Sequence, residues 1–133
     1  LTLDVGSHVP MHCTASGKLF LAHMTPEEHT AVLPQPLKQY TAKTITDPYQ
    51  LTRQLNQICQ QQYAIVHEEY ETGFSSVAAP IYNHLGKLLA TVSISGPAYR
   101  LSEAAFQEYL PTLLATCRTI SAELGFTVNQ PIL

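Results

Sequence analysis

A run of small residues near the start of the chain, His12 to Lys18 with the sequence HCTASGK, precedes the apolar residues Leu19 to Ala22. The first N–H groups of a helix have no partner within the helix, and small side chains leave them accessible. A helix that begins here could therefore bind an anion or a carboxylate at its N-terminus. The same pattern is also typical of an ordinary helix start whose N–H groups meet only water.

A second candidate lies between Lys87 and Gly96, where the residues alternate as in a β-strand. The apolar face carries Leu88, Ala90, Val92 and Ile94, and the other face carries Leu89, Thr91, Ser93 and Ser95. The two serines could donate hydrogen bonds to a carboxylate or a sugar hydroxyl that lies across the strand. Ser76 on the preceding strand joins them only if the hairpin register places it on that face. The alternative is a solvent-exposed face on which small hydroxyl residues are simply tolerated.

Two further arrangements resemble catalytic or metal sites. Cys13 follows His12, as a nucleophile beside a base would, but adjacent residues rarely present their side chains to each other in that geometry. His8 and His12 have the spacing of metal ligands on a helix, but Pro10 between them disfavours a helix. We therefore expect no catalytic residue, no bound metal and no other cofactor.

Three charged residues are expected to have structural roles. Glu68 and Glu69 are adjacent, so on a strand they point to opposite faces and cannot form an acid/base pair by themselves. They are predicted to form hydrogen bonds or to order a turn. Arg100 follows the Gly96-Pro97 pair and is expected to pair with an acidic group or to order the loop before the last helix.

Length and composition predict one compact domain over residues 1–133, because a chain of this size can bury around two-thirds of its unfolded surface in one core. The formal net charge of −3, with seven Lys plus Arg, argues against a nucleic-acid-binding surface, since that affinity depends mainly on cations. No apolar run approaches the roughly twenty residues that cross a bilayer, and no signal segment opens the chain. We expect a cytoplasmic domain whose three widely spaced cysteines are reduced thiols.

The elements that must position these residues follow from capping residues and periodicity. Helices are predicted from Thr25 to about Leu33, from Asp47 to about Gln62, and from Ser102 to Leu124. Strands are predicted at 63–69, 75–83 and 87–96, with 84–86 as the hairpin turn between the last two. Residues 37–46 have no clear period and are predicted to form a loop over the surface.

Apolar stripes indicate how the two longer helices pack. The helix at 47–62 is predicted to pack through Leu51, Leu55, Ile58 and Cys59. The last helix is predicted to pack through Phe106, Tyr109, Leu110, Leu113, Cys117, Ile120 and Leu124. Pro111 is expected to bend this helix and Gly125 to end it. Without a βαβ crossover or a phosphate-binding glycine pattern, the chain is predicted to be α+β, with an antiparallel sheet and helices packed over it.

Three segments in register resemble one protein family. The segment from Glu68 to Leu101, EEYETGFSSVAAPIYNHLGKLLATVSISGPAYRL, the TASGK element at 14–18 and the closing segment from Ile120 to Gly125 are similar to the effector-binding domain of IclR-family transcription regulators. The resemblance implies a GAF-like fold that binds a small molecule. It also implies that residues 1–133 form the C-terminal two-thirds of the effector domain, without its upstream part and without the helix-turn-helix domain that binds DNA.

The resemblance implies a pocket at particular positions of this chain. The backbone N–H groups of Ala15 and Ser16 would hold a carboxylate, and the hydroxyls of Ser76, Ser93 and Ser95 would bind the other end of the molecule. Val9 and Leu1 are possible apolar walls. Val66 occupies a position where a polar or acidic residue occurs in the family, so an effector with an apolar or aromatic body is expected.

Two functions from different classes remain. The first is a sensor of a small organic or aromatic acid, which acts in a homodimer or homotetramer and changes how the full-length protein binds DNA. The second is a small-molecule enzyme on a GAF-like scaffold that uses Cys13 or a carboxylate. A sensor needs affinity without turnover, whereas an enzyme needs a titratable group that faces the substrate. The predicted pocket contains hydroxyl and backbone donors, which favours the sensor.

Overall fold

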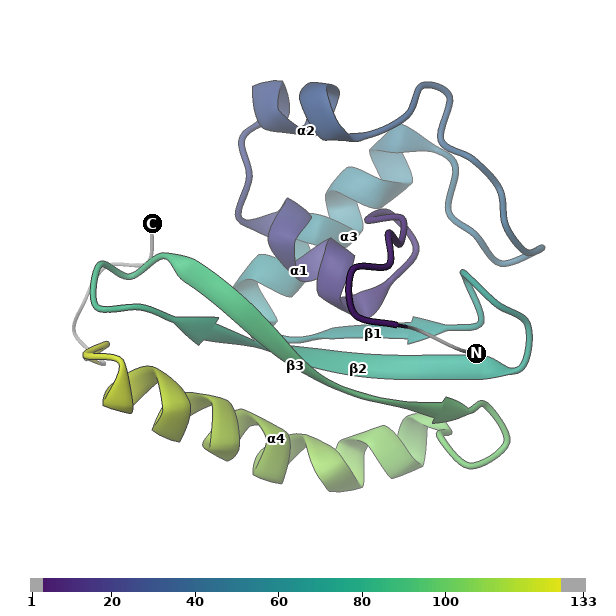
Figure 1. Ribbon diagram of the computed structural model, residues 1–133. Helices are drawn as coiled ribbons and strands as arrows, with labels where there is room; N and C mark the ends of the chain where they lie inside the picture. Colours follow the sequence, from purple (N-terminus) through teal and green to yellow (C-terminus); the bar gives the residue numbers. More distant parts are fainter. Residues whose placement is uncertain (1–3, 128–133) are drawn as a thin grey trace.

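A three-stranded antiparallel sheet lies between helices on both of its faces in the computed structural model, which describes residues 4–127 (Figure 1). The helices are α1 (Ala15–Ala22), α2 (Pro26–Val32), α3 (Pro48–Gln61) and α4 (Glu103–Glu123). The strands are β1 (Ala64–His67), β2 (Phe74–Tyr82) and β3 (Leu88–Pro97), with β2 in the middle. The expected α+β fold, with helices packed over an antiparallel sheet, is confirmed.

The strand register decides which side chains share a face of the sheet. In the β1–β2 pair Val66 lies opposite Ser76, and in the β2–β3 pair Ser76 lies opposite Ser95. Residues directly opposite each other in an antiparallel pair point to the same face. Val66, Ser76 and Ser95 therefore form one row across the sheet. Ser93 lies two residues before Ser95 on β3 and points to the same face. Ser76 therefore lies on the same face of the sheet as Ser93 and Ser95, as the predicted pocket requires.

Each face of the sheet has its own hydrophobic core. On the face that carries Ser76, α1 and α3 pack through Ala15, Leu19, Leu21, Leu51, Leu55 and Ile58 onto Ala64, Val66 and Ala78 of the strands. On the other face, α4 packs through Phe106, Leu110, Leu113 and Cys117 onto Val77, Ala79 and Ile81. Alternating residues of β2 thus enter different cores, as the period of two residues along a strand requires.

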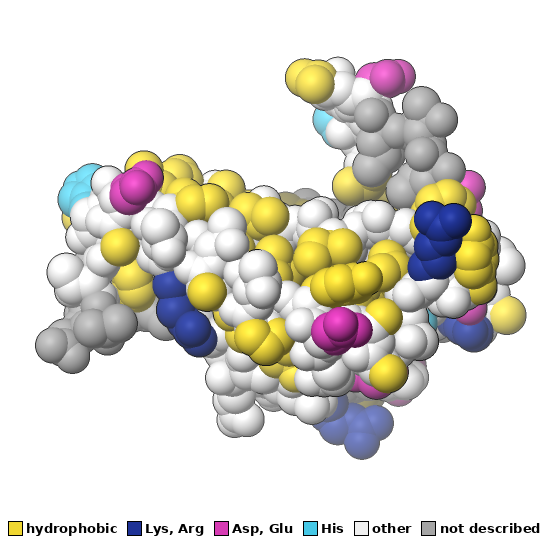
Figure 2. All heavy atoms as spheres, turned by 90° about the horizontal axis from the view of Figure 1, so that it is seen from below, with side chains coloured by type: hydrophobic (Ala, Val, Ile, Leu, Met, Phe, Trp, Pro, Cys, Tyr) yellow, Lys and Arg dark blue, Asp and Glu magenta, His cyan; other side chains and the backbone are white. Residues whose placement is uncertain are grey.

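The outer face of α4 is exposed and largely uncharged in its middle part. Pro111, Thr112, Ala115 and Thr116 are exposed there. Figure 2 shows hydrophobic side chains along the middle of this face, with a few separate charged groups around them. The helix runs unbroken past Pro111 from Glu103 to Glu123. No helix among residues 4–127 is long and apolar enough to cross a membrane.

The predicted helix ends agree with the structure, because the capping residues are present as expected. Thr25 forms a capping box with Glu28, and Asp47 and Ser102 cap α3 and α4. Gly125, with a φ of 91°, directly follows the C-cap of α4. This conformation is accessible to glycine at low cost, which explains why the helix ends here.

Three residues predicted to face inward are exposed, and these predictions were wrong. Cys59 is exposed, Tyr109 is 44% exposed and Leu124 is 41% exposed. Cys59 comes one residue after the buried Ile58, and Tyr109 comes one residue before the buried Leu110. A step of one residue along a helix rotates the side chain by about 100°, so both point away from the packed stripe. Leu124 is the C-cap of α4, at the very end of the helix.

Buried residues also occur outside the predicted apolar stripes, in α4 and in the segment 37–46. Ser121 of α4 is 3% exposed and accepts a hydrogen bond from the backbone N–H of Tyr82 at 3.0 Å. Residues 37–46 have no regular structure, as predicted, but they do not simply cross the surface. Leu37 joins the core beside α1 and α3, and Thr44 is 7% exposed.

The start of α1 is fixed by a cap and by a close backbone contact. Thr14 is the N-cap, and its hydroxyl accepts a hydrogen bond from the Gly17 N–H at 3.2 Å. A Cβ atom at position 17 would lie 2.4 Å from the Cα of Met11. Glycine is therefore required here for the preceding segment to pass directly across the first turn of α1.

A buried ion pair ties α1 to the loop between β1 and β2. The ammonium group of Lys18 donates to both carboxylate oxygens of Glu69 at 2.8 Å and to the side-chain oxygen of Gln54 on α3. Lys18 is fully buried, and Glu69 is 7% exposed. Burial lowers the pKa of Lys18, and the neighbouring Glu69 carboxylate opposes this shift.

The same loop is held from outside by residues 41–44. The Thr41 hydroxyl donates to the carbonyl of Glu68 at 2.6 Å, and the Thr44 hydroxyl donates to the carbonyl of Glu69. The Glu68 carboxylate accepts from Lys43 and from the Gly73 N–H, each at 2.8 Å, and these hydrogen bonds lower its pKa. Glu68 and Glu69 thus order the turn, as predicted.

The two ion pairs predict very different responses to the same substitution. Lys18→Met leaves Glu69 buried without its cation, so we expect a loss of about 3–5 kcal/mol in the free energy of unfolding, measured by urea denaturation. The matched change Lys43→Met removes an exposed partner of Glu68 and should leave the unfolding midpoint almost unchanged. The double variant Lys18→Met/Glu69→Met should recover part of the lost stability, because no uncompensated charge remains. Equal effects of the two single changes would contradict a structural role for the buried pair.

Candidate ligand-binding site

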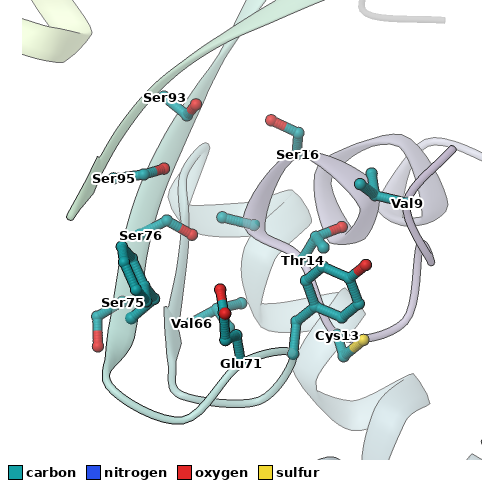
Figure 3. A pocket seen from close by; sticks show the side chains of 13 residues that line it. Val9, Cys13, Thr14, Ser16, Val66, Glu71, Ser75, Ser76, Ser93 and Ser95 are labelled. Atoms are coloured by element: carbon teal, nitrogen blue, oxygen red, sulfur yellow. The ribbon is translucent and has the colours of Figure 1, made fainter. Parts of the chain in front are cut away.

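A pocket lies between the first turn of α1, the sheet face that carries Ser76, and the loop that joins β1 to β2 (Figure 3). Its volume is about 140 Å³. An apolar cavity of about 150 Å³ holds one benzene molecule, so this pocket suits a ligand of roughly one ring.

The structure brings together every described residue that the sequence predicted for the pocket. Ala15 and Ser16 lie in the first turn of α1, and Ser76, Ser93 and Ser95 lie on β2 and β3. Figure 3 shows Ser16 directed from the helix toward the strand that carries Ser93 and Ser95. The predicted apolar residues Val66 and Val9 complete this set. Leu1 lies outside the described residues.

The helix start offers backbone donors. The N–H of Gly17 is used by the Thr14 cap, and the N–H of Lys18 bonds to the carbonyl of Thr14 at 2.9 Å. The N–H groups of Ala15 and Ser16 have no acceptor within the described part of the chain. They lie where the positive end of the helix dipole is strongest, so this end of the pocket favours a negative charge.

The sheet offers hydroxyl donors on the opposite side. The hydroxyls of Ser76, Ser93 and Ser95 have no hydrogen-bond partner among residues 4–127, and Ser93 and Ser95 are exposed. Each hydroxyl can both donate and accept. The hydroxyl of Thr91, which precedes them on the same face of β3, donates instead to Ser16 Oγ at 2.7 Å.

Sequence reasoning missed the contribution of the loop between β1 and β2. Tyr70, Glu71 and Phe74 line the pocket, together with Cys13 and Thr14 from the segment before α1. The paired glutamates and Gly73 signal a turn here, but nothing in the local pattern shows that the turn folds back toward α1. That placement depends on Lys18 and Thr44, which are distant in the sequence.

Ser75 lies at the pocket with a different orientation from its neighbour Ser76. Its hydroxyl is directed away from the cavity in Figure 3, as the alternation along β2 requires. The Ser75 Oγ atom is buried and has no hydrogen-bond partner in the described structure. Ser75 therefore adds surface to the pocket without offering its hydroxyl to a ligand.

The thiol in the pocket is not suited to nucleophilic catalysis. Cys13 is completely buried, and burial together with the nearby Glu69 carboxylate raises its pKa to about 12. At neutral pH the group is therefore a thiol, whereas the thiolate is the reactive form. The neighbouring His12 is also buried, and its Nε2–H donates to the carbonyl of Lys38 at 2.7 Å.

The remaining charged candidates do not form a metal or ligand site. No group of three possible metal ligands occurs among residues 4–127, and His12 is directed into the protein interior. Arg100 is exposed, and its guanidinium lies over the ring of Tyr99 at 5.5 Å. The charged residue that lines the pocket is Glu71.

The chain is similar to known transcription regulators. It is 34% identical over 126 residues to the transcriptional repressor AllR of Escherichia coli K12, and 36% identical over 123 residues to the regulator KdgR of the same organism. These matches cover 94% and 92% of this chain but 46% and 47% of the relatives, so the chain spans about half their length. The named role of both relatives is transcriptional regulation rather than catalysis, in agreement with the expectation of a non-enzyme.

Solved structures show the same fold. The Thermotoga maritima IclR structure superimposes with a TM-score of 0.85 at 38% identity, and the match covers 95% of this chain and 51% of that one. A second neighbour is the inducer-binding domain of PobR from Acinetobacter in a double-mutant form in complex with 3-hydroxybenzoic acid. It matches with a TM-score of 0.78 at 27% identity, over 91% of this chain and 68% of that one.

The family model described as the C-terminal domain of the bacterial transcriptional regulator IclR matches residues 1–122. This match extends over nearly the whole described structure, from the segment before α1 to the last turns of α4. The chain therefore belongs to the IclR family of bacterial transcriptional regulators and represents its C-terminal domain.

Proposed function

We propose that this domain senses a small carboxylic acid and that its occupancy changes DNA binding by the full-length regulator. The observation that carries the proposal is the arrangement of donors around the pocket. The unpaired N–H groups of Ala15 and Ser16 lie on one side, and the hydroxyls of Ser76, Ser93 and Ser95 lie on the other. Such a set binds a carboxylate and a second polar group, and none of these donors is itself an acid or a base at neutral pH.

The rest of the pocket limits the body of the acid. Val66, Val9 and Phe74 provide an apolar wall, and the volume of about 140 Å³ suits a single ring or a short chain. The carboxylate of Glu71 disfavours a second negative charge nearby. A monoacid with an apolar or aromatic body fits these constraints. The PobR relative, which was crystallised with 3-hydroxybenzoic acid, supports this choice of ligand class.

DNA contact is proposed to belong to a part of the protein outside this chain. The net charge of −3, with seven Lys plus Arg, does not favour binding to a phosphate backbone by this domain. A ligand can regulate DNA binding only if it binds two states of the protein with different affinity. We propose that those states differ in how two or four copies of the regulator pack together.

The domain should bind a carboxylic acid more tightly than the uncharged carboxamide of the same compound. We expect at least one of benzoate, 3-hydroxybenzoate, 4-hydroxybenzoate, pyruvate and gluconate to raise the melting temperature of the domain. Its carboxamide should bind more weakly by about 1.5–3 kcal/mol, because it loses charge-assisted hydrogen bonds at the start of α1. Thermal-shift measurements give the melting temperature, and calorimetry gives the affinities for the acid and the carboxamide.

Two results of this comparison would count against the proposal. Equal affinity for an acid and its carboxamide would mean that α1 does not hold the carboxylate. Mass analysis after prolonged incubation should return the acid unchanged, and a product that accumulates with time would contradict a sensor.

An acid at a hundredfold excess over its dissociation constant should stabilise the fold by about 2.7 kcal/mol.

The serines of β3 should affect affinity and not folding. Ser93→Ala and Ser95→Ala remove exposed hydroxyls that have no described partner, so the free energy of unfolding should change by less than about 1 kcal/mol. Binding of the best acid should weaken by about 0.5–1.5 kcal/mol for each change. Thr112→Ala on the outer face of α4 is the control and should leave affinity unchanged. If both serine variants bind as tightly as the parent, these hydroxyls do not contact the ligand.

Thiol reactivity tests the pocket chemistry independently of any ligand. Cys59 is exposed, whereas Cys13 and Cys117 are buried and burial raises the pKa of both. We therefore expect one thiol to react rapidly with a disulfide reagent at neutral pH in the native protein, and three in denaturant. Cys59→Ser should abolish the rapid phase. Rapid modification of Cys13 in the Cys59→Ser protein would support a reactive cysteine and revive the enzyme alternative.

A further inference from the structure

Ser16 of α1 and Thr91 of β3 form a hydrogen bond across the edge of the pocket. The Thr91 hydroxyl donates to Ser16 Oγ at 2.7 Å, and the two residues are 75 positions apart in the sequence. Both side chains are partly buried. Thr91 does not line the pocket itself, although it shares the β3 face with Ser93 and Ser95. This contact therefore links the two elements that carry the proposed donors.

We propose that Thr91 is a positioning residue that fixes the Ser16 hydroxyl as a donor to the carboxylate of the ligand. The inference rests on the ligand-binding role proposed above and adds a residue to it. A hydroxyl group has one hydrogen and two lone pairs. With Thr91 as the donor to the Ser16 oxygen, the hydrogen of Ser16 is available for another acceptor. No such acceptor is present among the described residues, and the Ser16 side chain is directed toward the sheet across the pocket (Figure 3).

This arrangement gives one residue two donors for the same anion. The backbone N–H of Ser16 has no acceptor in the described structure, and the oriented hydroxyl adds a second donor beside it. Together with the N–H of Ala15 they can bind both oxygens of one carboxylate, which a carboxamide or a ketone cannot match. Without Thr91 the Ser16 hydroxyl can rotate freely and can also accept a hydrogen bond, so the selection for an acid should weaken.

The experiment uses the 133-residue chain and 3-hydroxybenzoate as the probe, with benzoate, pyruvate and gluconate measured in parallel by calorimetry. Thr91→Val keeps the branched shape and removes the hydroxyl. We expect it to raise the dissociation constant for the bound acid about threefold to tenfold, the range for one net hydrogen bond. Thr91→Ser keeps the donor and should restore affinity to within about twofold of the parent. The carboxamide should lose less affinity than the acid.

A double-variant cycle separates positioning from a general structural effect. Ser16→Ala removes the group on which Thr91 acts, so Thr91→Val should cause no further loss in the Ser16→Ala background. An equal loss in both backgrounds overturns the inference, because Thr91 would then act through the fold. If Ser93→Ala weakens binding and Thr91→Val does not, the inference alone fails. If the parent chain binds none of these four acids and does not bind 4-hydroxybenzoate either, the proposed function fails and the role of Thr91 with it.

Discussion

The buried ion pair between Lys18 and Glu69 is the contact on which the pocket depends. The pair joins α1 to the loop after β1, and these two segments form facing walls of the cavity. An ammonium group that is fully buried is stable only when its partner and further acceptors are in place, which here are Glu69 and Gln54. The pair therefore accepts few alternative arrangements. Its strict geometry holds the first turn of α1 at a fixed distance from Tyr70 and Phe74, although neither charge faces the cavity as a ligand-binding group.

The hydrogen-bond donors of the pocket are uncharged groups, and the charged residue that lines it is Glu71. The Lys18 and Glu69 charges compensate each other, and the Cys13 thiol keeps its proton because burial and Glu69 raise its pKa to about 12. Hydroxyls and backbone N–H groups remain as the donors, and their hydrogen-bonding capacity does not change with pH in this range. Under the proposed function, these donors would bind an acid without taking part in a reaction. This property separates a sensor from an enzyme more clearly than the fold does, because one fold can host both functions.

Local pattern predicted much of this structure, and long-range packing determined the rest. The alternation along 87–96, the turn at 84–86 and the caps at Thr25, Asp47 and Ser102 were sufficient to place the hairpin and three of the helices. The resemblance to a family supplied the pocket positions, which the strand register then brought together on one face. The pocket positions of Tyr70 in the loop and Phe74 at the start of β2, the burial of Thr44 and the exposure of Cys59 could not be predicted in this way. Each depends on which segment packs against it, and residues 41–44 meet the loop after β1 only because the chain returns from far away.

β3 serves the pocket with one face and the core beneath α4 with the other. Ser93 and Ser95 face the cavity, whereas Val92 and Ile94, which alternate with them, pack against the core that α4 covers. Consecutive residues of one strand are joined by planar peptide units, so a shift of the backbone at one residue also moves its neighbours. If a ligand binds Ser93 and Ser95 as proposed, a displacement of these residues would reach Val92 and Ile94 through the backbone of the same strand. β3 therefore borders both the pocket and the core beneath α4, and the largely uncharged middle part of the outer face of α4 lies on the far side of that core (Figure 2).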